Sequence, residues 1–140
     1  MKTELHACVV LSDYPIKTMV YERLLGALGE KRVHAFRSLD ADFSGLEDTK
    51  LVVCDMNIME ESEPLAMANL EDMFPNANIL FLQEDHSDMQ IRFSNQRDIC
   101  CLGKLSANSV LQSILKELLL QADSRLRKLA PRPGMRMQQA

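Results

Sequence analysis

Asp13, Asp55 and Lys104 are the residues of this chain whose types and positions could do chemistry together. Each comes directly, or one residue, after a short run of apolar residues. A carboxylate can act as a nucleophile, neighbouring carboxylates can hold Mg²⁺, and a lysine can balance the charge on phosphoryl oxygens. These residue types indicate phosphoryl transfer onto Asp55, provided that the fold brings them together.

The apolar run before Asp55 predicts how that residue is positioned. Residues 51–54 (Leu-Val-Val-Cys) have no polar alternation, which is typical of a strand buried on both faces of a parallel sheet. Asp55 is then expected at the carboxyl end of the strand. Ligands and chemistry gather at that end in open α/β sheets, so Asp55 marks the predicted functional edge.

Strands and helices are expected to alternate along the chain. The apolar runs predict strands at 7–11, 33–36, 51–55, 78–82 and 99–102. Apolar positions at helical spacing predict helices at 15–28, 64–74 and 106–130, whereas the polar stretch 37–46 predicts only a short or irregular helix. These β-then-α units predict a three-layer α/β fold with a doubly wound, five-stranded parallel sheet in the order 2-1-3-4-5.

Two segments depart from simple alternation. Between the fourth and fifth expected strands, Met89, Ile91 and Phe93 alternate with polar residues at strand period, and a short, displaced or irregular helix is expected there. The last helix has a broad apolar stripe that continues to Leu126 and Leu129. This stripe is wider than packing on a sheet needs, so we expect part of it to meet another helix.

Two further polar residues follow predicted strands. Ser12 lies beside Asp13, and Gln83 comes directly after the fourth strand. In the predicted strand order both lie on the same rim as Asp55 and Lys104. The turn after the first strand contains no glycine, which argues against a glycine-rich loop for a nucleotide.

Length and composition favour an ordinary globular domain. The 140 residues are 46% hydrophobic and 26% charged, and no apolar run approaches the ~20 residues of a membrane span. We expect one domain over 1–122, a helix extension with a basic tail over 123–140, no contact with a membrane, and a cytoplasmic location. The four cysteines lack metal-ligand spacing and fall in predicted strands, so they are expected to be reduced core residues.

Charge is distributed unevenly along the chain. Residues 1–124 hold 11 Lys/Arg and all 20 Asp/Glu, a net charge of −9, whereas 125–140 hold five basic residues and no acid. The acidic body is therefore a poor binder of nucleic acid. The basic tail is interpreted as a solvated linker, with contact to an acidic partner or nucleic acid as the alternative.

The motifs at the strand ends resemble those of a bacterial response-regulator receiver domain, over residues 5–122. Residues 11–16 (Leu-Ser-Asp-Tyr-Pro-Ile) are similar to the family's acidic turn after the first strand, and 53–59 (Val-Cys-Asp-Met-Asn-Ile-Met) to its phosphoacceptor loop. Gly-Lys at 103–104 is similar to its fifth-strand lysine. Residues 37–45 look like the degenerate receivers of biofilm and curli regulators, which carry a C-terminal helix-turn-helix domain.

The resemblance implies a receiver or flavodoxin-like fold and a role for each site residue. Asp55 is the phosphoacceptor equivalent, Lys104 the equivalent of the phosphoryl contact, and Gln83 stands at the Thr/Ser switch position. Asp13 and Asp55 would bind Mg²⁺ weakly, because Ser12 replaces the other acid of the turn. No cofactor is required if the site is degenerate.

Three departures from the family pattern favour a degenerate receiver. Gln83 is longer than the hydroxyl residue that it replaces, Cys101 stands at the switch aromatic position, and Met59 replaces a common loop proline. The hydroxyl and the aromatic ring that normally relay phosphorylation are therefore both absent, although charge added at Asp55 would still perturb the rim.

Three functional hypotheses follow from the resemblance. The first is a pseudo-receiver in signal transduction and transcription regulation, which is not an enzyme. It forms a homodimer through one of two surfaces: either the segment between the last two strands together with the last strand and the last helix, or the extended last helix alone. The second is a phosphoacceptor that modifies itself on Asp55 with Mg²⁺ and a histidine kinase or other regulator as partner. The third is a sensor of a cyclic dinucleotide. An unrelated α/β domain is the remaining alternative, and DNA would be reached only through an output domain that is not in this sequence.

Overall fold

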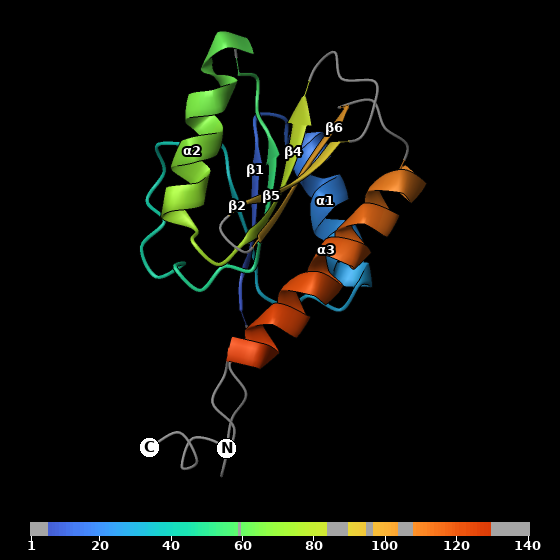
Figure 1. Cartoon of the computed structure of the whole chain (residues 1–140). Coiled ribbons are helices and arrows are strands. Elements are labelled where there is room, and N and C mark those ends of the chain that lie inside the picture. Colours follow the sequence, from blue (N-terminus) through green and yellow to red (C-terminus); the bar gives the residue numbers. More distant parts are fainter. Residues whose placement is uncertain (1–5, 59, 84–89, 95–96, 104–107, 130–140) are drawn as a thin grey trace.

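The computed structural model describes residues 6–58, 60–83, 90–94, 97–103 and 108–129. Its strands are β1 (Cys8–Ser12), β2 (Val33–Phe36), β3 (Leu51–Asp55), β4 (Asn78–Gln83), β5 (Gln90–Ser94) and β6 (Arg97–Gly103). Its helices are α1 (Pro15–Ala27), the single 3₁₀ turn η1 (Glu60–Ser62), α2 (Glu63–Met73) and α3 (Asn108–Leu129). Figure 1 shows α2 on one side of the sheet and α1 with α3 on the other.

The predicted parallel sheet is confirmed. The strands lie in the order β2-β1-β3-β4-β6-β5, and all neighbours except β6 and β5 are parallel. The five parallel strands thus have the predicted order 2-1-3-4-5 and form a receiver or flavodoxin-like fold. All five residues of both β1 and β3 are buried, which explains why these strands read as unbroken apolar runs.

The sixth strand corrects the expectation of a helix between the last two parallel strands. Over residues 90–94 the chain forms β5, which pairs antiparallel with β6 through Arg92 and Ile99. The strand-period alternation and the β-favouring Ile91 and Phe93 explain this outcome, because both match a strand better than a helix. A dimer face that includes a helix at 90–94 is therefore ruled out.

Two apolar cores lie on the two faces of the sheet. The even-odd alternation along each strand sends Val10, Leu51 and Val53 toward α1 and α3, and sends Val52 and Cys54 toward α2. The α2 side also holds a pair of edge-to-face ring contacts that join Phe36, Phe43 and Phe74. All four cysteines are free and lie in strands, as predicted.

Helix α1 was correctly predicted, but its buried face was not. Its buried residues are Tyr21 and Leu25, whereas Ile16 and Met19, which are apolar and at helical spacing, are 77% and 50% exposed. Lys17, Tyr21 and Leu25 follow one another at intervals of one turn and face the sheet together. Leu24 and Leu28 also pack, partly buried, against the same core.

Helix α3 runs to Leu129, as its apolar stripe predicts. The stripe, however, packs against the sheet of the same domain. Its buried residues are Leu111, Leu115, Leu118, Leu119 and Ala122. Val110 and Leu120 are the large apolar residues of α3 that stay exposed among those with described burial. The surplus of apolar surface expected for another helix is thus much smaller than the sequence indicates. The helix continues through residue 122, where a domain boundary was expected, without a break.

The polar stretch between β2 and β3 forms turns and no helix, in line with its predicted irregularity. Within the described residues, none of the helices has the length and apolar character that crossing a membrane requires.

Candidate functional site

The carboxyl ends of β1 and β3 bring Ser12 and Asp55 side by side. The two residues are register partners in the parallel ladder, and each is the last residue of its strand. Both are fully buried. Asp55 is two residues beyond Val53 in the strand, so its side chain lies on the same face as α1.

Helix α1 supplies two polar partners to Asp55. The Tyr21 hydroxyl donates a hydrogen bond to Oδ2 of Asp55 at 2.5 Å, and Nζ of Lys17 lies 3.4 Å from the same oxygen. Burial, followed by the hydrogen bond to Asp55 and its charge, raises the pKa of Tyr21 well above its ordinary value. The phenol therefore stays protonated and remains a donor, while Lys17 balances the carboxylate charge.

The residues of the turn after β1 hold the rim in shape. Ser12 Oγ accepts a hydrogen bond from the Tyr14 amide at 3.2 Å, a local turn contact. Oδ2 of Asp13 accepts one from the Asn57 amide at 2.6 Å and so ties the loop after β3 to the loop after β1. Asp13 is exposed, whereas Asp55 is buried. The two carboxylates thus lie near the same rim in different environments.

These contacts occupy one oxygen of each carboxylate, and the expected weak binding of Mg²⁺ by Asp13 and Asp55 stays a prediction. One oxygen of Asp13 is used on a backbone amide, and Oδ2 of Asp55 is shared by a phenol and an ammonium group, which would compete with a cation. Within the described part of the chain, no group of three or more His, Cys, Asp or Glu side chains is placed to hold a metal ion.

Gln83 ends β4 on the same rim but is directed to a different partner. Its Nε2 donates to Oε1 of Glu63, in the first turn of α2, at 2.9 Å. Gln83, which the resemblance placed at the Thr/Ser switch position, therefore links β4 to α2. Cys101, at the expected aromatic position, packs partly buried against the core on the α2 side.

The structure brings together only part of the predicted site. Ser12 and Asp55 are adjacent, Asp13 reaches the loop after Asp55, and Gln83 points to α2. Lys104 and Met59 lie outside the described residues, so the predicted contact of Lys104 with Asp55 stays a prediction. The sequence analysis missed Lys17 and Tyr21. Their spacing of one helical turn, directly after the first strand, was the available signal.

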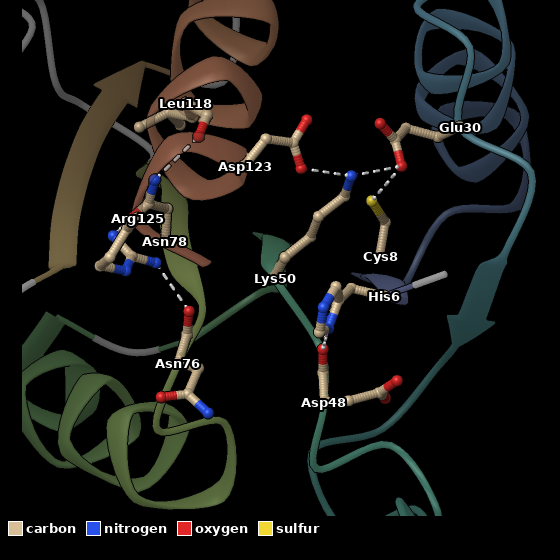
Figure 2. Close-up of polar contacts among 10 residues, drawn as sticks. All are labelled: His6, Cys8, Glu30, Asp48, Lys50, Asn76, Asn78, Leu118, Asp123 and Arg125. Atoms are coloured by element: carbon tan, nitrogen blue, oxygen red, sulfur yellow. Dashed lines mark hydrogen bonds and ion pairs between the residues drawn. The ribbon is translucent and has the colours of Figure 1, made fainter. Parts of the chain in front are cut away.

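A second polar cluster lies at the opposite, amino edge of the sheet, and no sequence motif indicated it. Lys50, just before β3, places Nζ 3.0 Å from Glu30 Oε1 and 2.8 Å from Asp123 Oδ1 (Figure 2). Burial acts to lower the pKa of Lys50, but its contacts with the two carboxylates outweigh burial and raise it. The Cys8 thiol donates to Glu30 at 3.6 Å, and burial together with Glu30 raises the pKa of that thiol, which keeps it protonated.

The same edge holds a second set of contacts around Asn78, the first residue of β4. Its Nδ2 donates to the Leu118 carbonyl at 2.8 Å, and its Oδ1 accepts from Arg125 at 2.9 Å. The other arm of the Arg125 guanidinium donates to the Asn76 carbonyl at 2.7 Å (Figure 2). Two strands of the sheet thus contact α3 through polar side chains.

Comparison with known proteins gives a fold but no family. No protein family matches the chain, and no curated protein does. Among solved structures, a pilus assembly-related protein from Burkholderia pseudomallei K96243 is 19% identical with a TM-score of 0.61, over 84% of this chain and 91% of that one. The pilus assembly protein CpaE from Burkholderia thailandensis E264 is 18% identical with a TM-score of 0.59, over 82% of this chain and 98% of that one. At these identities the likeness establishes a shared fold.

Proposed function

We propose that this chain is a pseudo-receiver, a receiver-like domain that acts by contact with proteins and in which Asp55 is a structural carboxylate. The observation that carries this proposal is the environment of Asp55. The side chain is fully buried, and its Oδ2 is held by the Tyr21 hydroxyl at 2.5 Å and by Lys17 at 3.4 Å.

The chemistry of a phosphoacceptor explains why this environment argues against regular phosphorylation. A carboxylate oxygen must reach the phosphorus atom in line with the leaving group, beside a metal that neutralises the phosphoryl charge. Oδ2 of Asp55 would have to give up the hydrogen bond that the Tyr21 hydroxyl donates to it. Hydrogen bonds to charged groups contribute about 1.5–3 kcal/mol. Asp13, the remaining carboxylate of the turn, already holds the Asn57 amide.

Incubation with acetyl phosphate and Mg²⁺, followed by intact mass measurement, tests this part of the proposal. We expect no phosphoryl adduct on the wild-type chain under conditions that modify a competent receiver in the same tube. Asp55→Asn is the matched control, because it keeps the shape of the side chain and removes the nucleophile. A phosphoryl adduct on the wild type that is missing from Asp55→Asn would contradict the proposed structural role of Asp55.

Self-association is the second part of the proposal. Val110 and Leu120 leave an exposed apolar surface on α3, and Ile16 and Met19 leave another on α1, the helix that covers the same face of the sheet. We place the contact between copies on α3, with Leu120 in it. A contact between copies would remove the apolar surface of these side chains from water, which favours association.

The setting that we propose is the assembly of a surface appendage. Two proteins named for pilus assembly share the fold of this chain over most of their length. A structural role for Asp55 agrees with such a setting, because an assembly component needs a contact surface more than a phosphorylation switch. Regulation of transcription through a separate output domain is the alternative.

A further inference from the structure

The last two turns of α3 are held differently from the rest of the helix. From Leu111 to Ala122 the helix is fixed by buried apolar side chains on the sheet. After Ala122, residues 123–126 are only partly buried, and two of them, Asp123 and Arg125, are charged. The helix nevertheless continues to Leu129. Polar contacts therefore position this end of the helix.

Four residues make these contacts, and we call Lys50, Asn78, Asp123 and Arg125 the clasp. Lys50 lies at the start of β3 and bonds Asp123 at 2.8 Å, and Asn78 lies at the start of β4 and bonds Arg125 at 2.9 Å. Figure 2 shows the two contacts side by side on consecutive parallel strands. The two contacts join the sheet to α3 at Asp123 and Arg125, which are two positions apart in the helix.

Both sheet residues of the clasp are themselves held in place. Lys50 is 8% exposed and is fixed from the other side by Glu30 at 3.0 Å. Asn78 is fully buried and also bonds the Leu118 carbonyl, within the part of α3 that packs on the sheet. Groups that are oriented before the contact forms lose less entropy when it does. Asp123, by contrast, has a side chain that is 39% exposed, so water can take the place of Lys50.

We propose that the clasp holds residues 123–129 of α3 as a separable unit, which can be released while residues 111–122 stay packed on the sheet. This makes the clasp a conformational device. It sets the position of the last two turns of α3, and it does so at the amino edge of the sheet. Asp55 lies at the other end of β3, so the device works independently of that residue and of the proposed function.

Amide hydrogen exchange resolved by NMR tests the proposal on the full chain. The variants are Asp123→Asn, Arg125→Gln and the two combined, which leave the buried Lys50 paired with Glu30. Glu117→Gln is the matched control, because it removes one charge from the exposed side of the same helix, where Glu117 only accepts a bond from Gln121.

In the double variant we expect exchange at residues 126–129, whose amides bond to carbonyls at 122–125, to be about tenfold faster than in the wild type. That ratio, about 1.4 kcal/mol, is modest for the loss of the contact of Asp123 with Lys50 and the two contacts of Arg125, with Asn78 and the Asn76 carbonyl. Exchange at 111–122 should stay within about twofold, which also shows that the variant is folded. The single variants should give intermediate rates, and Glu117→Gln should match the wild type.

Four results would overturn the proposal. One is a wild type without protection at 126–129, because nothing would then be held. Another is equal acceleration in both parts of the helix, which would make α3 one cooperative unit. The last two are an unchanged rate at 126–129 in the double variant, and the same acceleration in Glu117→Gln.

Discussion

Tyr21 and Lys17 reach Asp55 from successive turns of α1 and share one of its oxygens. A buried carboxylate needs such partners, because removing charge from water without compensation is costly. These contacts stabilise the buried carboxylate, so a structural role explains the site as well as a reactive one does. The phenol and the ammonium also explain why α1 turns Tyr21 inward and leaves Ile16 in solvent.

The first prediction concerns the Tyr21 hydroxyl. Replacing Tyr21 with Phe keeps the ring and removes the donor to a charged, fully buried acceptor. We expect the free energy of unfolding to fall by about 2 kcal/mol, within the range for hydrogen bonds to charged groups. Chemical denaturation measures this change directly.

Tyr14→Phe is the matched control for that substitution, because Tyr14 is 48% exposed. It should change the free energy of unfolding by less than about 0.5 kcal/mol, as surface substitutions usually do. Equal effects of the two substitutions would show that the Tyr21 hydroxyl contributes nothing specific to the domain.

At the scale of elements, the two faces of α3 have separate tasks. The leucines of one face are buried against the sheet, while the other face exposes Leu120 and polar residues. Helix α2, on the far side of the sheet, exposes Leu65 in the same way. Because the two leucines lie on opposite sides of the sheet, they can be used to locate a contact between copies.

The second prediction is that Leu120→Glu weakens self-association. Burying a leucine at an interface contributes about 1.5–3 kcal/mol, so its loss should weaken a dimer by tenfold or more. Sedimentation velocity across a concentration series measures this effect. Leu65→Glu, at a leucine that is also exposed but lies on the other side of the sheet, should leave the dimer intact.

Two outcomes would contradict self-association through α3. A wild-type chain that sediments as a monomer at the highest concentration would exclude the dimer altogether. A stronger effect of Leu65→Glu than of Leu120→Glu would move the contact to the α2 side.

At the scale of the whole molecule, the fold is shared with two proteins named for pilus assembly. The third prediction is that deleting the gene in its own organism reduces the number of surface pili, counted by electron microscopy. Complementation with Asp55→Asn should restore them as well as the wild type does, because the proposal gives Asp55 no phosphoryl group to carry.

Complementation with Leu120→Glu should fail if contact between copies is the working part of the domain. Immunoblots must show equal amounts of each variant, so that a loss of pili is not a loss of protein. Unchanged pili in the deletion strain would place the domain in another process, and failure of Asp55→Asn at normal abundance would return a role to that carboxylate.

The parallel strands could be predicted because each of them is a short run with apolar residues, and their order followed from the doubly wound β-then-α pattern and the resemblance to receivers. The run over 51–54 also placed Asp55 correctly at the end of β3. β5 was the exception, since its residues alternate at strand period, whereas the regular alternation of strands and helices along the chain led us to expect a short or irregular helix there. Local periodicity was the better guide, because it reports directly on which side chains can be buried together.

By itself the sequence predicted the five parallel strands, the long helices and the rim on which Ser12, Asp55 and Gln83 end, but not the antiparallel β5. Only the tertiary structure decided what those residues contact: Asp55 meets Tyr21 and Lys17, Gln83 meets Glu63, and Lys50 meets Asp123. The reason is physical. Buried apolar residues recur along the chain with the period of the helix or strand, so they can be recognised from neighbouring residues alone. A polar contact depends instead on a partner side chain that is distant in the sequence.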